Sequence, residues 1–218
     1  MSNGHFSNTV PQSPTFTEPK VIVFDLGKVL LDFDFYKAAR TLAGDSDSSP
    51  EEVAGLINQT PLLHRYETGL ITTQEFFDEF RVLTGYRKSL PEFCRGLGDI
   101  FTEVGLMVGL NRWFRSKGLP TYIFSNTSEL AVDHIRATFP FFSEFSGYIL
   151  SYEHRVMKPD PRLYEVVERT VGTSGCQILY FDDRAENIET ARDRGWQVIL
   201  HDRPEGSLRI LRQAGLAP

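Results

Sequence analysis

The stretch KVIVFDLGKVLLDFD, residues 20–34, constrains the fold of this 218-residue chain more than any other segment does. It opens with an unbroken run of Val, Ile, Val and Phe at residues 21–24, which is typical of a strand buried on both faces of a parallel sheet. Asp25 follows this run directly. Open α/β sheets bind their ligands at the crevice beyond the carboxyl ends of the strands, so Asp25 is a candidate site residue. Asp25 fits equally well as the polar residue of an ordinary turn.

The second half of the chain alternates between strands and helices. We predict strands over residues 120–124, 147–150, 178–181 and 197–200. We predict a helix over residues 105–117 before the first of these strands, and helices from about 128, over 160–171 and over 184–195 between them. Alternation at this spacing favours an α/β fold, in which helices cover both faces of a parallel, doubly wound sheet.

Residues 34 to about 103 interrupt this alternation, because they carry several helix signals and no convincing strand. One such signal is Thr72 with Glu75 three residues later, which together form a capping box at the start of a helix. Another helix is expected over residues 91–101. We interpret the segment as a helical cap inserted into the sheet domain. The predicted organisation is a flexible tail at 1–18, a core made of 19–33 and 104–218, and a cap at 34–103.

Charge and hydropathy narrow the class of partner. The formal net charge of −6 argues against nucleic acid and anionic membranes, since both attract basic surfaces. No window approaches the roughly 20 consecutive apolar residues of a membrane-spanning helix. The first 18 residues lack the cationic start and apolar core of a signal peptide. We expect a cytoplasmic protein that binds a small molecule, and either a monomer or a homodimer would be ordinary for it.

Polar residues follow three of the predicted strands, and the carboxyl ends of parallel strands meet at one edge of a sheet. A fourth polar group, a lysine, lies in the loop RVMKPDP before a predicted helix. We expect all of them to meet at that edge. The candidates are Asp25, Ser125, Asn126, Lys158, Asp182 and Asp183. Each also has a plainer interpretation, as a helix cap for the hydroxyl, amide and acidic residues and as a solvated surface cation for the lysine.

Phosphoryl transfer is the chemistry that these groups suggest together. Asp25 is the candidate nucleophile, because carboxylates form covalent acyl phosphates in some transferases. Paired carboxylates suit Mg²⁺, a hard cation that takes oxygen ligands and accompanies phosphate. We expect Asp183 to be the direct carboxylate ligand beside Asp25 and the Gly27 carbonyl. Asp182 is a further candidate ligand.

The remaining candidates concern the phosphate group. Ser125 is expected to hydrogen-bond a phosphate oxygen, with help from backbone amides at the start of the next helix. Lys158 supplies a positive charge that offsets the carboxylates and the phosphate. Further candidates for phosphate binding are Gly27, Lys28, Asn126 and Asn187.

The chain resembles the haloacid dehalogenase superfamily, whose four motifs occur in order between residues 20 and about 200. They are FDLGKVL at 24–30, FSNT at 124–127, Lys158-Pro159 and FDDRAEN at 181–187. The resemblance implies a Rossmann-like core, Mg²⁺ dependence, a cap inserted after the first motif and a shielded pocket for a small substrate. Within the superfamily, DLGKVLLDFDF and the segment YETG at 66–69 resemble α-glucose-1-phosphate phosphatases and the phosphatase-like domain of soluble epoxide hydrolases. A small phosphorylated metabolite, with a sugar phosphate favoured, is the substrate that this resemblance implies.

One position departs from that pattern. Most phosphatases of the superfamily have a second Asp two residues after the nucleophile, where it serves as general acid and base, and this chain has Gly27. Loss of a general acid costs on the order of 10²- to 10⁴-fold in rate. Lys28, Asp32 and Asp34 are possible substitutes, although acids in such a segment usually face solvent.

Three functions remain open because of this departure. The first is a Mg²⁺-dependent phosphatase of small phosphorylated metabolites. The second is a non-catalytic protein that binds phosphate or a partner. The third is a 2-haloacid dehalogenase, which the Asp182-Asp183 pair disfavours because halide displacement needs no metal. Residues 64–67 of the cap, including Tyr66 and Glu67, are candidates for contacting the substrate and fit equally well as the wet face of a helix.

Overall fold

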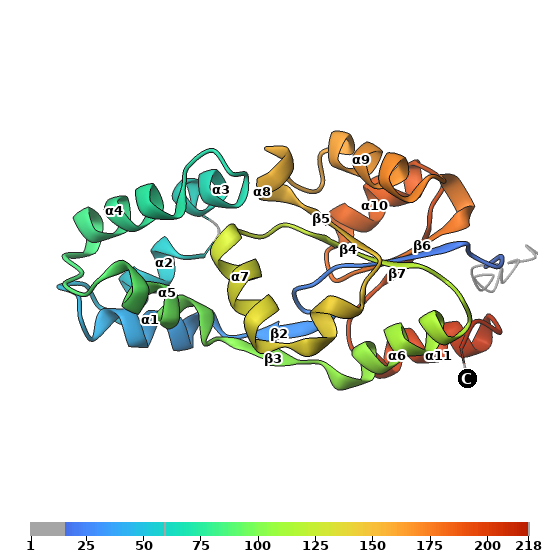
Figure 1. The fold of residues 1–218 in the computed structure, drawn as a ribbon, viewed down its shortest axis with the longest axis horizontal. Helices are drawn as coiled ribbons and strands as arrows, with labels where there is room; N and C mark the ends of the chain where they lie inside the picture. Colours follow the sequence, from blue (N-terminus) through green and yellow to red (C-terminus); the bar gives the residue numbers. More distant parts are fainter. Residues whose placement is uncertain (1–15, 59, 218) are drawn as a thin grey trace, which may run out of the picture.

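A five-stranded parallel sheet forms the centre of the molecule, in the order β5-β4-β1-β6-β7 (Figure 1). The computed structural model describes residues 16–58 and 60–217. The strands are β1 (Val21–Phe24), β4 (Thr121–Ser125), β5 (Gly147–Leu150), β6 (Ile178–Asp182) and β7 (Gln197–Leu200). This sheet confirms the α/β fold that the alternation in the sequence predicts.

Alternate side chains of β1 enter two different hydrophobic clusters, one on each face of the sheet. Ile22 and Phe24 pack with apolar residues of α6 (Gly105–Ser116), α7 (Glu129–Thr138) and α11 (Pro204–Gln213). Val21 and Val23 pack with those of α9 (Pro161–Val171) and α10 (Ala185–Asp193). Figure 1 shows α9 and α10 on one side of the sheet and α6 and α11 on the other. The sheet is therefore doubly wound, as predicted, and α11 is a helix that the sequence analysis did not predict.

Three short helical elements complete the α/β part. They are the 3₁₀ turn η1 (Pro140–Glu144), α8 (Ser151–His154) and the 3₁₀ turn η2 (Gly175–Gln177).

A separate group of helices, which we call the cap, occupies the stretch between β2 (Leu31–Phe33) and β3 (Phe101–Glu103). Its helices are α1 (Phe35–Ala43), α2 (Pro50–Leu56), α3 (Pro61–Glu67), α4 (Thr73–Thr84) and α5 (Leu90–Gly98). The capping box of Thr72 and Glu75 begins α4, as predicted. The cap has its own hydrophobic cluster, in which Phe93 is fully buried among the rings of Phe76, Phe77, Phe80 and Tyr86. The helical insertion is confirmed, whereas the residue bounds of the three segments remain a prediction.

The prediction of no strand between residues 34 and 103 is wrong. The helix α5 ends at Gly98, and the next residues form β3 (Phe101–Glu103), which pairs antiparallel with β2 (Leu31–Phe33). These two strands are the chain segments that enter and leave the cap. Each is only three residues long, so neither shows the alternation by which a strand is recognised in a sequence. Their pairing is a tertiary contact between distant segments.

The segment before β1 is described only in part, since residues 1–15 of the predicted flexible tail lie outside the described residues. At residue 17, the backbone N–H of Thr17 donates to Gln197 Oε1 at 2.7 Å, and Gln197 Nε2 donates to the Thr17 carbonyl at 3.0 Å. Within the described part of the chain, no helix has the length and apolar character needed to cross a membrane.

Candidate active site

The carboxyl ends of β1, β4 and β6 lie side by side and bring most of the predicted site residues together. Phe24 of β1 pairs with Phe181 of β6, so Asp25 and Asp182 follow at the same level of the sheet. Ser125 is the last residue of β4. The loop before α9 adds Lys158, whose side chain lies at the ends of these strands and contacts Asp25 and Asp182.

Lys158 is the centre of a buried network. Its Nζ lies 3.0 Å from Asp25 Oδ1 and 2.7 Å from Asp182 Oδ2, and it donates to the Phe124 carbonyl at 2.9 Å. Only 1% of its side chain is exposed, so it is not the solvated surface cation of the plainer interpretation. Burial acts to lower the pKa of Lys158, but the charges of Asp182 and Asp25 outweigh burial and raise that pKa. The lysine is therefore held in its charged form between two carboxylates.

Asp182 has hydrogen-bond partners on both carboxylate oxygens. Its Oδ1 accepts from the Arg184 backbone N–H and from Asn187 Nδ2, both at 2.9 Å. Its Oδ2 accepts from Lys158 Nζ and from the Tyr180 hydroxyl. Burial acts to raise the pKa of Asp182, but Lys158 and the other donors lower it below its ordinary value. In this arrangement Asp182 and Asn187 orient Lys158, and their predicted roles as metal ligand and phosphate ligand remain predictions.

Asp25 keeps one carboxylate oxygen unbonded. Its Oδ1 accepts from the Leu26 backbone N–H at 2.7 Å and faces Lys158, while Oδ2 accepts no hydrogen bond from the described residues. Burial raises the pKa of Asp25 to about 8, against the opposing effect of Lys158 and with further raising by Asp182 and Asp183. The free oxygen is thus available to a cation or to an electrophile.

Asp183 completes a cluster of acids around one point. Carboxylate oxygens of Asp25, Asp182 and Asp183 all lie within 4.8 Å of one another. Burial, followed by the charge of Asp182, raises the pKa of Asp183. Three acids and one buried lysine share this point, so the acids would carry an excess of negative charge when all are ionised. A divalent cation with oxygen ligands fits this excess, and Mg²⁺ is the hard cation that combines carboxylates with phosphate oxygens.

Asn126 holds the lysine loop against the end of β4. Its Oδ1 accepts from the Lys158 backbone N–H at 2.8 Å, and its Nδ2 donates to the Lys158 carbonyl at 2.9 Å. This side chain is therefore engaged with protein groups. Ser125 is 3% exposed, and its hydroxyl makes only a long hydrogen bond of 3.3 Å to the Asn126 carbonyl. The Ser125 hydroxyl remains the better placed of the two predicted phosphate contacts.

The residues just after Asp25 do not join this network. Lys28 Nζ donates to Asp32 Oδ1 and, at 3.0 Å, to the Phe33 carbonyl, and its side chain is 42% exposed. Asp34 caps α1 by accepting from the backbone N–H groups of residues 36 and 37. All three candidates for a substitute acid thus have partners of their own. The predicted phosphate contact of Lys28 remains a prediction.

The family follows from a comparison that covers most of the chain. A family model described as haloacid dehalogenase-like hydrolase matches residues 19–195. The chain belongs to this family of hydrolases.

Three relatives of this hydrolase are informative. A D-ribitol-5-phosphate phosphatase from Bacteroides thetaiotaomicron is 25% identical over 193 residues, which cover 83% of this chain and 90% of the relative. A sesquiterpene phosphatase from Aspergillus oryzae is 24% identical over 183 residues, covering 84% and 89%. A solved structure of a haloacid dehalogenase family enzyme from Bacteroides thetaiotaomicron, in complex with magnesium and inorganic phosphate, has a TM-score of 0.75 at 22% identity and covers 83% of this chain and 93% of its own.

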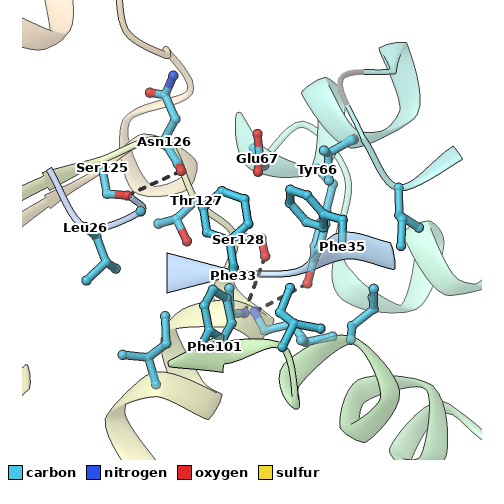
Figure 2. A pocket seen from close by; sticks show the side chains of 18 of the residues that line it. Leu26, Phe33, Phe35, Tyr66, Glu67, Phe101, Ser125, Asn126, Thr127 and Ser128 are labelled. Atoms are coloured by element: carbon cyan, nitrogen blue, oxygen red, sulfur yellow. Dashed lines mark hydrogen bonds between the residues drawn. The ribbon is translucent and has the colours of Figure 1, made fainter. Parts of the chain in front are cut away.

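A cavity of about 130 Å³ lies between the cap and the α/β part of the hydrolase, next to the loops that carry the network (Figure 2). Gly27, Ser125 and Asn126 line one part of it, and Glu67 of α3 lines another. Most other lining residues are aliphatic or aromatic. These apolar walls were not predicted from the sequence, because they come from β2, β3, the cap and α7 and share no spacing along the chain.

Proposed function

We propose that this hydrolase is a Mg²⁺-dependent phosphatase of small phosphorylated metabolites. The observation that carries the proposal is Asp25, whose Oδ1 is held by Lys158 and the Leu26 amide while its Oδ2 has no partner among the described residues. A carboxylate fixed through one oxygen presents the other to an electrophile. The relatives that are phosphatases by name, and the related structure with magnesium and inorganic phosphate, support a phosphate ester as that electrophile.

The reaction proceeds in two displacements at phosphorus. Asp25 Oδ2 attacks the phosphorus atom, the bond to the leaving oxygen breaks, and an aspartyl phosphate forms. Water then attacks the same phosphorus atom and releases inorganic phosphate and the free Asp25 carboxylate. Lys158 offsets the negative charge that gathers in both steps, and the Ser125 hydroxyl donates to a phosphate oxygen.

Asp25, Asp183 and the Gly27 carbonyl are the groups that we assign to Mg²⁺. When bound, this cation neutralises phosphate charge and keeps Asp25 ionised. Asp182 acts beside it as the partner of Lys158, because both of its oxygens already accept hydrogen bonds. The assignment of Mg²⁺ explains why so many acids lie together at a buried point.

The two related phosphatases are named for substrates of different classes. One is named for D-ribitol 5-phosphate, which supports the sugar phosphate implied by the resemblance to α-glucose-1-phosphate phosphatases. The other is named for sesquiterpenes, which points to an apolar ester. The two remaining functions from the sequence analysis are less favoured. A dehalogenase has no use for the acidic cluster, and a binding protein has no use for a carboxylate oxygen held free.

The proposal is tested by release of inorganic phosphate from acetyl phosphate and p-nitrophenyl phosphate, each with Mg²⁺ and with excess EDTA. We expect release that EDTA abolishes. Asp25→Asn should abolish turnover without changing the melting temperature by more than a few degrees. The matched control is Asp133→Asn, at an exposed acid of α7, which should keep wild-type activity. Full activity of Asp25→Asn, or no release from any ester by the folded protein, would overturn the proposal, and chloride release from 2-chloropropionate would then identify a dehalogenase.

A further inference from the structure

The cavity beside the network has a polar end and an apolar body. Gly27, Ser125 and Asn126 form the polar end, where the catalytic loops meet. The body is lined mainly by aliphatic and aromatic side chains, several of which are only partly buried (Figure 2). They include Phe33, Phe35, Leu97, Phe101 and Leu130, with Tyr66 beside them.

Two polar side chains in the body of the cavity, Tyr66 and Ser128, already have partners, whereas the Glu67 carboxylate has none among the described residues. The Tyr66 hydroxyl is bonded to Thr73 Oγ1 at 2.8 Å and accepts from the Leu130 backbone N–H at 3.4 Å. Ser128 Oγ accepts from the Ala131 backbone N–H at 3.4 Å. Sugar hydroxyls that entered here would lose water and find few free donors or acceptors, which is unfavourable. Hydrocarbon would instead cover the exposed parts of the apolar walls, which is favourable.

We propose, resting on the proposed phosphatase function, that the substrate is a phosphate monoester of an apolar alcohol, aliphatic or aromatic. Its phosphate lies at Asp25 and its hydrocarbon part lies in the cavity between the cap and the sheet. A sugar phosphate is the competing substrate class.

A homologous series of n-alkyl phosphates tests this proposal. From methyl to hexyl phosphate, kcat/KM should rise by about 4-fold for each methylene until the cavity is filled, which is the factor for burying one CH₂ group. The best ester should exceed D-ribitol 5-phosphate and α-glucose 1-phosphate by 10-fold or more. A flat series, or a sugar phosphate that exceeds every alkyl ester, would overturn the proposal.

Variants of the wall locate the effect in the cavity. Leu97→Gln should lower the ratio of kcat/KM for the best alkyl ester to kcat/KM for acetyl phosphate, which has almost no organic part, by about 10-fold. Leu83→Gln on the exposed face of α4 is the matched control, since Leu83 is 57% exposed. If Leu97→Gln fails to fold, Leu97→Trp should fill the cavity and move the optimum to shorter esters. If the wild type does not hydrolyse acetyl phosphate, the phosphatase function is contradicted. If the folded wall variants keep the wild-type preference for chain length, only the binding of the hydrocarbon part in the cavity is contradicted.

A second observation concerns the missing general acid. Glu67 is the one carboxylate among the described residues that line the cavity. Its backbone is fixed, because the Ser151 hydroxyl donates to the Glu67 carbonyl at 2.6 Å and accepts from the Thr127 N–H at 2.9 Å. Its carboxylate makes no hydrogen bond or ion pair with the described residues and lies within the electrostatic influence of Arg184. A carboxylate without a partner therefore faces the cavity from the cap.

In-line attack by Asp25 would put the leaving oxygen on the side of phosphorus away from Asp25, and Glu67 lines the neighbouring cavity from the cap. The attacking water occupies the same position in the second step. Because residue 27 has no side chain, a carboxylate that lines the cavity from the cap is a candidate for both steps.

We infer, again resting on the phosphatase function, that Glu67 is the general acid and base that replaces the absent acid at position 27. In the first step the Glu67 carboxylic acid gives its proton to the leaving oxygen as the bond from phosphorus to that oxygen breaks. In the second step the Glu67 carboxylate takes a proton from water as the bond from phosphorus to Asp25 breaks. Burial raises the pKa of Glu67 to about 7, against the effect of Arg184, which suits a group that both gives and takes a proton.

Aryl phosphates with leaving groups of different acidity test Glu67. Glu67→Gln should lower kcat by about 100-fold on phenyl phosphate and by less than 3-fold on 2,4-dinitrophenyl phosphate, whose leaving group needs no proton. Glu153→Gln on α8 is the control and should change neither rate. A loss that is equal for both esters would show that Glu67 only positions the cap, and no loss for either would remove it from the reaction. Turnover of the dinitrophenyl ester keeps the phosphatase function separate from both outcomes.

Discussion

The two sides of the candidate site are built on opposite principles. On the sheet side, Lys158, Asp182 and Asn187 are 5% exposed or less, and their charged and amide side-chain groups have hydrogen-bond partners. On the cap side the walls are apolar, and the one carboxylate, Glu67, has no hydrogen-bond partner among the described residues. Directional bonds fix positions to within tenths of an ångström, whereas apolar contact tolerates change of shape. We infer from this contrast, on the proposed phosphatase function, that the sheet side determines the chemistry and the cap side selects the substrate.

The largest loss of stability and turnover is expected from replacing Lys158, the central residue of the sheet side. Lys158→Met leaves the Asp25 and Asp182 carboxylates buried without their counter-charge. Removing one partner of a buried pair costs about 3–5 kcal/mol of unfolding free energy, and turnover should fall by at least about 10³-fold. Urea unfolding and phosphate release measure the two effects. Lys88→Met, at a lysine 46% exposed and 3.7 Å from Asp45, is the control and should lose less than about 1 kcal/mol.

The pH dependence of this variant has a definite sign. Without Lys158 the two buried acids have pKa values raised above their unfolded values, so the folded state binds protons more tightly than the unfolded state does. The variant should therefore recover stability, relative to the wild type, as the pH falls below about 7. A stability difference that stays constant between pH 7 and pH 5 would contradict the assignment of the loss to unpaired carboxylates.

The meeting of the sheet-side residues could be predicted from the sequence, because they belong to short contiguous motifs at strand ends, whereas their roles remain predictions. Asp25, Ser125 and Asp182 each follow an apolar run, and parallel strands must deliver such residues to one edge. The detailed partners were beyond sequence reasoning. Which of Asp182 and Asp183 binds Lys158 depends on the alternation of side chains at the end of β6, and Asn126 contacts the lysine backbone rather than a ligand.

The cap side could not be predicted in the same way. The pairing of β2 with β3 joins residues about 70 positions apart, and the walls of the cavity come from segments spread between Leu26 and Ile135, so no local pattern records which of them meet. Glu67 was one of four adjacent polar candidates in the sequence. Only the end of α3 and its link through Ser151 single it out.

An acid introduced at position 27 would allow the sheet side, instead of Glu67 on the cap side, to supply the proton. A Cβ at Gly27 would lie 2.9 Å from Phe33 Cε1, so the Phe33 ring must move or be replaced by a smaller side chain. In the Glu67→Gln background, Gly27→Asp with Phe33→Leu should restore phenyl phosphate turnover by about 10-fold, since a sheet-side acid then supplies the proton. In the wild-type background the same pair of changes should alter turnover by less than about 3-fold, because Glu67 already acts. Phe33→Leu alone in the Glu67→Gln background is the control, and a recovery there would mean that space, not the acid, limits the rate.

The smallest effect is expected at the junction between the two sides, where Lys28 and Asp32 form an ion pair with side chains 42% and 63% exposed. Asp32→Asn should lower the unfolding free energy by no more than about 0.5 kcal/mol at pH 7, because water and salt screen such a pair. The hydrogen bond from Lys28 lowers the pKa of Asp32 below its unfolded value, so this contribution exists above about pH 4 and disappears as the pH falls further. Phosphatase activity should remain within about 2-fold of the wild type, since the proton comes from Glu67. If Asp32→Asn instead lowers turnover of phenyl phosphate by 10-fold and leaves turnover of the dinitrophenyl ester unchanged, Asp32 and not Glu67 is the general acid.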